Sequence, residues 1–181
     1  MEKHNIKYVD EIVCFQEVPH EISVSFSISN CVHNCDGCHS KYLCSDTGKE
    51  LEPILEEKLK YYFGLATCIL FMGGDDKFQI ESLIRCLELC KKYNFKTALY
   101  SGNTQVDDRL KVLLDYIKIG PFKKELGGLN SPTTNQKMYK KPDYGWEDIT
   151  FMFAKKKKLK NDSFLPIATS TTHQFHGVIQ K

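Results

Sequence analysis

Three cysteines within eight residues are the side chains of this sequence most suited to chemistry. Cys31, Cys35 and Cys38 lie in the segment Asn-Cys-Val-His-Asn-Cys-Asp-Gly-Cys, which follows a stretch in which serine alternates with apolar residues. Thiolates are soft ligands that favour zinc or iron–sulfur clusters. Structural zinc sites and electron-transfer clusters use four protein ligands. Three cysteines therefore predict a [4Fe–4S] cluster with one iron open to another molecule.

A zinc site in the same loop is the alternative. His33, His39 or Cys44 could complete a set of four ligands. The usual zinc pattern has two C-x2-C-like pairs set well apart, and this chain has no second pair. Gly37 permits a tight turn before Cys38 and lets backbone N–H groups approach the sulfides, which favours the cluster.

Two further loops carry glycine and polar residues directly after predicted strands. Gly73, Gly74 and Asp75 follow a short apolar run, and Ser101 follows the next predicted strand. Glycines let a ligand approach the backbone, and a carboxylate can accept hydrogen bonds from a positively charged amino group. An ordinary turn is the alternative reading of the Gly-Gly-Asp segment.

The elements that position these loops alternate between strands and helices. Period-two alternation or a short apolar run predicts a strand, and apolar residues at helical spacing predict a helix. Helices are predicted to begin near residues 51, 80 and 107. Strands are predicted over residues 22–29, 67–72, 96–100, 116–119 and 149–153.

This alternation predicts an α/β fold, a partial open (β/α) barrel of about four parallel strands with helices outside. In such folds ligands lie beyond the carboxyl ends of the strands. The cysteine loop, the Gly-Gly-Asp loop and the Ser-Gly-Asn loop should therefore share one face. We expect residues 1–154 to form this domain and residues 155–181 to form a basic, poorly ordered tail.

Composition and charge predict a soluble cytoplasmic protein. The formal net charge is +2, and residues 155–181 carry six lysines and one aspartate, so the rest is mildly acidic. We expect no nucleic-acid partner, because no global basic footprint is visible. We also expect no membrane contact, because no apolar run is long enough to span a bilayer. The amino terminus has no apolar signal core, so the eight cysteines are expected to be reduced.

Together these residues resemble the radical S-adenosylmethionine (SAM) superfamily. The chain looks most like the activating proteins of the anaerobic ribonucleoside-triphosphate reductase, a branch of the glycyl-radical activating enzymes. The resemblance rests on the C-x3-C-x2-C spacing and on the Gly-Gly-Asp segment, which stands where the family has its glycine-rich SAM-binding motif. The Ser101-Gly102 pair and residues 117–136 add weaker similarity, and the resemblance covers residues 8–139.

The resemblance implies which residues hold the cofactors. Cys31, Cys35 and Cys38 would hold three irons of the cluster, and the fourth iron would bind SAM. Glycine before the third cysteine is usual in this branch, whereas His39 stands where the branch commonly has tyrosine. The implied SAM-binding residues come from all three loops and are Gly37, Cys38, His39, Gly73, Gly74, Asp75 and Ser101.

The resemblance also implies a reaction and its partners. A reduced cluster cleaves SAM, and the resulting 5′-deoxyadenosyl radical abstracts hydrogen from a glycine of the partner enzyme. That partner would be the large subunit of the anaerobic (class III) ribonucleotide reductase, and the electron donor a low-potential protein such as flavodoxin or ferredoxin. Two other functions stay open: a small radical SAM enzyme that modifies a different protein or peptide, and a zinc-stabilised binding module.

Overall fold

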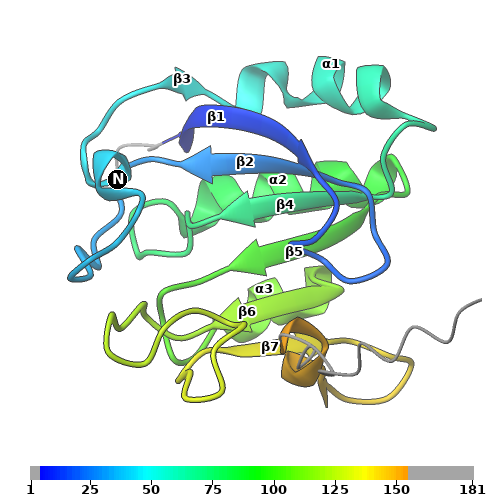
Figure 1. Ribbon diagram of the computed structural model, residues 1–181. Coiled ribbons are helices and arrows are strands. Elements are labelled where there is room, and N and C mark those ends of the chain that lie inside the picture. Colours follow the sequence, from blue (N-terminus) through cyan, green and yellow to red (C-terminus); the bar gives the residue numbers. More distant parts are fainter. Residues whose placement is uncertain (1–4, 155–181) are drawn as a thin grey trace, which may run out of the picture.

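The computed structural model describes residues 5–154, which form one mixed β-sheet with three α-helices on one of its faces (Figure 1). In chain order the elements are β1 (Lys7–Cys14), β2 (Ser23–Ile28), the 3-10 helix η1 (Lys41–Cys44), β3 (Lys49–Glu50), α1 (Glu52–Tyr62), β4 (Cys68–Met72), α2 (Ile80–Lys92), β5 (Lys96–Tyr100), α3 (Asp108–Leu113), β6 (Tyr116–Ile119), β7 (Lys137–Lys140), β8 (Glu147–Asp148) and the 3-10 helix η2 (Thr150–Phe153).

The middle of the sheet consists of four parallel strands. The strand order is β3-β1-β2-β4-β5-β6-β7-β8, and β2, β4, β5 and β6 run parallel to their neighbours in this group. Each of the three connections between these strands contains one α-helix: α1 precedes β4, α2 precedes β5 and α3 precedes β6. Because these strands are parallel, their carboxyl ends all lie at one edge of the sheet.

The three α-helices pack on the same face of the sheet and bury its larger apolar cluster. The cluster includes Phe26 and Phe71 from the strands and Leu59, Leu87 and Leu110 from α1, α2 and α3. All five side chains are completely buried. Burial of a side chain of this size contributes about 1.5–3 kcal/mol to the stability of the fold. This cluster is therefore the main support of the sheet and of the edge at which the parallel strands end.

A second, smaller apolar cluster covers the opposite face of the sheet. Val18, from the connection between β1 and β2, packs there with Leu70, Tyr116, Met138 and Ile149. Side chains alternate between the two faces of a strand. The side chains of β2 on this face are therefore its serines, and its apolar residues lie on the face covered by the helices. This face therefore combines an apolar centre with polar side chains.

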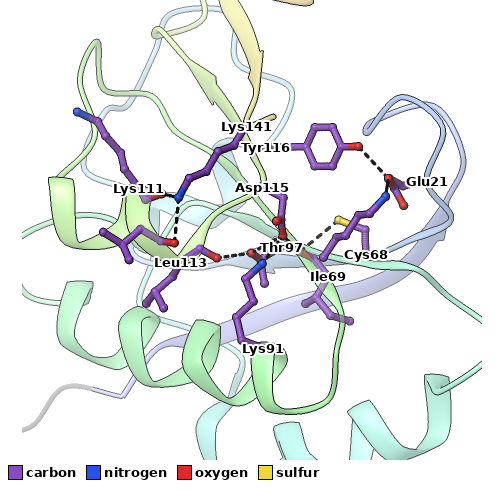
Figure 2. A network of polar contacts seen from close by, with 12 residues as sticks. Glu21, Cys68, Ile69, Lys91, Thr97, Lys111, Leu113, Asp115, Tyr116 and Lys141 are labelled. Atoms are coloured by element: carbon purple, nitrogen blue, oxygen red, sulfur yellow. Dashed lines mark hydrogen bonds and ion pairs between the residues drawn. The ribbon is translucent and has the colours of Figure 1, made fainter. Parts of the chain in front are cut away.

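A polar network fixes β5 against β6 at the amino-terminal ends of the two strands (Figure 2). The Asp115 carboxylate accepts hydrogen bonds from the Thr97 backbone N–H (2.7 Å) and from the Lys91 ammonium (2.5 Å). The Thr97 hydroxyl donates to the Leu113 carbonyl (2.6 Å). These partly buried contacts join the amino-terminal ends of the two strands and support the register that pairs Ala98 with Tyr116.

The predicted partial barrel with parallel strands and surrounding helices is wrong. β1 pairs antiparallel with β2 on one side of the parallel group, and β7 pairs antiparallel with β6 on the other. The sheet is open, because β3 and β8 lie at its two edges. Antiparallel neighbours need no crossover helix, so these added strands extend the sheet without extending the helical layer.

Most elements predicted within the parallel part are confirmed. The strands predicted for residues 22–29, 67–72, 96–100 and 116–119 correspond to β2, β4, β5 and β6, and the three predicted helices correspond to α1, α2 and α3.

The strand predicted for residues 149–153 is wrong, because Thr150–Phe153 form η2. The Thr150 backbone N–H donates to the Asp148 carboxylate (2.8 Å), and this contact turns the chain at the start of η2. The predicted tail lies outside the described residues. None of the helices in residues 5–154 has the length and apolar character that crossing a membrane requires.

Candidate functional site

The loops that follow β2, β4, β5 and β6 meet at the carboxyl edge of the parallel strands. In Figure 1 the arrowheads of β2, β4 and β5 point to the left, and these loops lie beyond them. Backbone hydrogen bonds link neighbouring loops: the Gly73 N–H donates to the Tyr100 carbonyl (2.9 Å), and the Ser101 N–H donates to the Lys118 carbonyl (2.8 Å). The residues predicted to form one site are therefore on neighbouring loops at one edge.

The cysteine loop is held at its base and has an internal turn. The Cys31 backbone N–H donates to the Leu43 carbonyl (2.9 Å), which closes the loop beside η1. The Cys38 N–H donates to the Cys35 carbonyl (3.2 Å), and the Ser40 N–H donates to the Cys38 sulfur (3.4 Å). The thiols of Cys31, Cys35 and Cys38 are free and partly exposed, so a ligand can reach them.

The cysteine loop packs directly on the loop that follows β5. A β-carbon added to Gly102 would lie 2.4 Å from Cδ2 of His33 and 2.8 Å from its Cγ. Real β-carbons do not approach other atoms so closely, so glycine is the residue that allows this contact. Gly102 thus has a packing role that its place in the Ser-Gly pair did not reveal.

The cysteine loop also contacts the long segment between β6 and β7. The rings of His39 and Phe122 are in edge-to-face contact, with their centroids 5.7 Å apart. The Lys124 side chain covers Gly37, since a β-carbon at Gly37 would lie 3.1 Å from Lys124 Cδ. His39 and Gly37, both predicted to contact SAM, therefore lie where the cysteine loop meets residues 120–136.

Gly73 and Gly74 both adopt backbone conformations that favour glycine. Their φ angles are +98° and +93°, in the left-handed region. Gly74 is buried, and a β-carbon there would lie 3.4 Å from Cγ2 of Ile28. The two glycines let the chain turn at the end of β4 while its backbone stays close to β2.

Asp75 belongs to a hydrogen-bonded group with two residues of the loop after β5. Its Oδ2 atom accepts hydrogen bonds from the Ser101 hydroxyl (2.5 Å) and from the Asn103 side-chain amide (2.8 Å). The Ser101 hydroxyl also accepts a hydrogen bond from the Asn103 backbone N–H (2.9 Å). Asn103 was absent from the predicted site, although its place two residues after Ser101 in one turn was a usable signal.

Lys118, near the end of β6, is a second residue that sequence reasoning missed. It is 9% exposed, and its ammonium donates to the Gly120 carbonyl (2.9 Å). Burial lowers the pKa of Lys118 to about 8, while nearby acidic groups, Asp75 among them, act in the opposite direction. The available signal was a lysine inside the otherwise apolar strand Tyr-Ile-Lys-Ile.

The cysteine loop fits an iron–sulfur cluster in the type of its donors. It carries three free thiols, which are the ligands such clusters use. Burial raises the pKa of the Cys31 thiol, and the neighbouring Cys44 thiol raises it further. Within residues 5–154, no three His, Cys, Asp or Glu side chains are grouped as a metal site. The fit therefore rests on donor chemistry and on the shared loop.

The chain matches none of the protein-family models, curated proteins or solved structures with which it was compared. The resemblance to the radical SAM superfamily therefore stays a prediction from the sequence. Any function proposed for the chain depends on the residues gathered at the carboxyl edge of the sheet.

Proposed function

We propose that the chain is a small radical SAM enzyme that generates a glycyl radical on the large subunit of an anaerobic (class III) ribonucleotide reductase. The observation that supports this proposal is the contact between the three-cysteine loop and the loop that orients Asp75. Soft thiols beside an oriented carboxylate suit a metal cluster that binds an amino acid through its charged groups.

The three cysteines have the role of cluster ligands in this proposal. Cys31, Cys35 and Cys38 would hold three irons of a [4Fe–4S] cluster. When bound and reduced, the cluster supplies the electron that cleaves the sulfonium group of SAM. The remaining thiols of the chain include Cys68, Cys86 and Cys90, which are buried and have no role in this chemistry.

The neighbouring loops would bind and orient SAM. Asp75 would accept a hydrogen bond from the amino group of SAM, because Ser101 and Asn103 hold its carboxylate in one orientation. Gly73 and Gly74 would let the methionine part of SAM approach the backbone at the end of β4. Gly37, His39 and Ser101 complete the proposed SAM site, with the ring of His39 already packed against Phe122.

Two protein partners and the cytoplasm belong to the proposed reaction. The radical would pass to a glycine of the reductase large subunit, and flavodoxin or ferredoxin would supply the electron in the cytoplasm. Because the loops at this edge are partly exposed, both partners could approach the site from the same side of the sheet. Neither a membrane nor a nucleic acid has a role in this reaction.

Anaerobic reconstitution with iron and sulfide, followed by reduction and addition of SAM, tests the proposal. We expect a brown protein that releases 5′-deoxyadenosine, and a glycyl-radical signal in electron paramagnetic resonance when the reductase large subunit is added. Cys35→Ala should lose the cluster and both products, because one of three ligands is removed.

Cys14→Ala is the matched control, because Cys14 is a partly exposed free thiol on β1, in a different part of the sheet. This variant should keep the cluster and its activity. A colourless wild-type protein that holds one zinc ion would contradict the proposal and favour a zinc-stabilised binding module. Release of 5′-deoxyadenosine without a radical on the reductase would instead favour a different protein or peptide substrate.

A further inference from the structure

A cavity of about 540 Å³ lies on the face of the sheet that carries the α-helices, at the place where the helical layer ends. α3 is the last α-helix of the described residues, and the chain passes from β6 to β7 without another one. β6 contributes Ile117 and Ile119 to the lining, and β7 contributes Tyr139, which stands opposite Ile117 in the register of the two strands. Directly opposite residues of an antiparallel pair project to the same face. The cavity is therefore bounded by β6, β7 and the start of α3.

Trp146, from the connection between β7 and β8, adds a second aromatic side chain to the lining. Its ring packs against the larger apolar cluster, and the Lys141 ammonium lies 5.9 Å from the ring centroid. The same ammonium donates to the carbonyls of Lys111 (3.0 Å) and Val112 (3.2 Å) in α3. These contacts tie the tryptophan to the end of α3. Two aromatic rings and two isoleucines thus form an apolar surface on which a planar ring can pack.

The charged groups of the lining are compensated within the chain. The Asp107 carboxylate pairs with the guanidinium of Arg109 (3.1 Å), and the Asp108 carboxylate pairs with the ammonium of Lys111 (2.8 Å). A charged ligand would have to compete with these ion pairs. The lining therefore favours an uncharged ligand over an anion or a cation.

The side chains of Thr104 and Gln105 add uncharged hydrogen-bonding groups to the lining. Both residues are exposed, so a bound ligand can replace water as their partner. A side-chain amide offers donors and an acceptor together, which is also the pattern along the edge of a nucleobase. Small-molecule sites are cavities of about 300–1,000 Å³ with mainly apolar and aromatic walls and a few polar groups. This cavity has each of these properties.

We propose that the cavity beside α3 binds an uncharged planar heterocycle of the nucleobase or nucleoside class. The ring would stack on Tyr139 and Trp146, and its polar edge would form hydrogen bonds with Thr104 and Gln105. None of the residues that line the cavity among residues 5–154 belongs to the proposed cluster site or SAM site. The inference therefore goes beyond the proposed function and does not depend on it.

Trp146 is the one tryptophan of the chain, so the tryptophan fluorescence of the full-length, metal-free protein reports on this cavity. We expect inosine and uridine to quench this fluorescence in a saturable way. Both probes are uncharged nucleosides, and neither contains the adenine of SAM.

Tyr139→Ala should weaken the binding of inosine by about tenfold, because one stacking ring is lost. Tyr144→Ala is the matched control and should bind inosine like wild type, since Tyr144 is 94% exposed and does not line the cavity. Circular dichroism checks the fold of each variant. If Tyr139→Ala does not fold, Tyr139→Leu takes its place, because leucine keeps an apolar side chain and removes the ring.

Gln105→Ala should change the ratio of the affinities for inosine and uridine, because the two bases present different hydrogen-bonding edges. An unchanged ratio would overturn the choice of a polar ring as the ligand. Binding of cyclohexanol as tightly as inosine would overturn it too, since cyclohexanol has no planar ring to stack.

A lack of quenching by both nucleosides up to their solubility limits would overturn the inference. So would an unchanged affinity for inosine in the folded Tyr139 variant. Displacement of bound inosine by SAM would also overturn it, because the nucleoside would then occupy the proposed SAM site. Binding of inosine to the cavity of a protein that takes up no cluster would support the inference while contradicting the proposed function.

Discussion

The Asp75 carboxylate receives hydrogen bonds from Ser101 and Asn103 through the same oxygen atom, Oδ2. Among residues 5–154, the side-chain hydrogen bonds to Asp75 reach this oxygen and not Oδ1. Hydrogen bonds that involve a charged group contribute about 1.5–3 kcal/mol. At the scale of single residues, an oriented carboxylate with a free oxygen is well suited to bind an ammonium group of a ligand.

Asp75→Asn should weaken the binding of SAM to the reconstituted protein by about tenfold or more, because the charged partner of the ammonium is lost. Isothermal titration calorimetry under anaerobic conditions measures this affinity. The iron content should not change, since Asp75 is not a cluster ligand in the proposal. Asp76→Asn is the matched control, because the Asp76 carboxylate accepts a hydrogen bond from the neighbouring Phe78 N–H (2.8 Å). Equal SAM affinities of the two variants would contradict the role of Asp75.

At the scale of elements, the candidate site depends on how closely the loops of neighbouring strands pack. β4 and β5 bring the Gly-Gly-Asp loop and the Ser-Gly-Asn loop side by side, because their register pairs Met72 with Tyr100. The cysteine loop, from β2, then reaches across and places His33 against Gly102. The contact between His33 and Gly102 is therefore one of several that position the cysteine loop, together with those of Leu43 and Phe122.

Gly102→Ala should force the His33 ring out of its place, since the added methyl group would lie 2.4 Å from His33 Cδ2, and this should loosen the packing of the cysteine loop on the turn after β5. We expect a lower content of iron and sulfide after reconstitution, while the far-ultraviolet circular dichroism stays unchanged. The double variant Gly102→Ala/His33→Ala removes the collision and should recover the cluster. If the double variant is as deficient as the single one, the contact does not position the thiols.

At the scale of the whole molecule, Glu21 joins three parts of the fold. It lies just before β2, and its buried carboxylate accepts hydrogen bonds from Lys96 of β5 (2.5 Å) and from the Tyr116 hydroxyl of β6 (2.8 Å), as Figure 2 shows for Tyr116. Burial raises the pKa of Glu21, but the hydrogen bonds from Lys96, Thr67 and Tyr116 outweigh it and leave the pKa below its ordinary value. The folded protein therefore favours the charged form of Glu21.

Glu21→Gln should lower the free energy of unfolding at neutral pH by about 1–3 kcal/mol, because the charged acceptor is lost. A carboxylate whose pKa is lowered by folding stabilises the protein above its unfolded pKa, and this contribution disappears as the pH falls through the folded pKa. The difference between wild type and variant should therefore shrink below pH 4.5, the ordinary pKa of the group. Urea unfolding from neutral pH to below pH 4.5 measures this difference in the free energy of unfolding. A difference that does not change with pH would contradict the role of the charged Glu21 carboxylate.

Short-range patterns predicted the parallel part of the sheet well. β4 is a continuous apolar run, and Ile80, Leu83 and Leu87 are spaced so that one face of α2 is apolar. These signals are local, because they depend on the period of a strand or a helix. The cysteine spacing is also a local signal, and it indicated soft-metal chemistry without any knowledge of the fold.

The antiparallel strands could not be predicted in the same way. β1 contains an irregularity between Tyr8 and Asp10, where the register with β2 shifts and the side-chain alternation is interrupted. β7 is formed by only four residues, and its ends are exposed. Both strands depend on pairing with β2 or β6, and such pairing between distant segments leaves little trace in a local pattern.

The sequence by itself predicted soft-metal ligands, which stays a prediction, and it determined which loops follow the parallel strands. Tertiary structure decided that the sheet is open rather than a barrel, because antiparallel strands flank the parallel group. It also decided that Lys118 is buried near the end of β6, where it donates to the Gly120 carbonyl, and that His33 packs on Gly102. The burial of Lys118 and the contact of His33 with Gly102 involve residues that are distant in the chain, so their energies depend on strand pairing and loop packing rather than on local sequence.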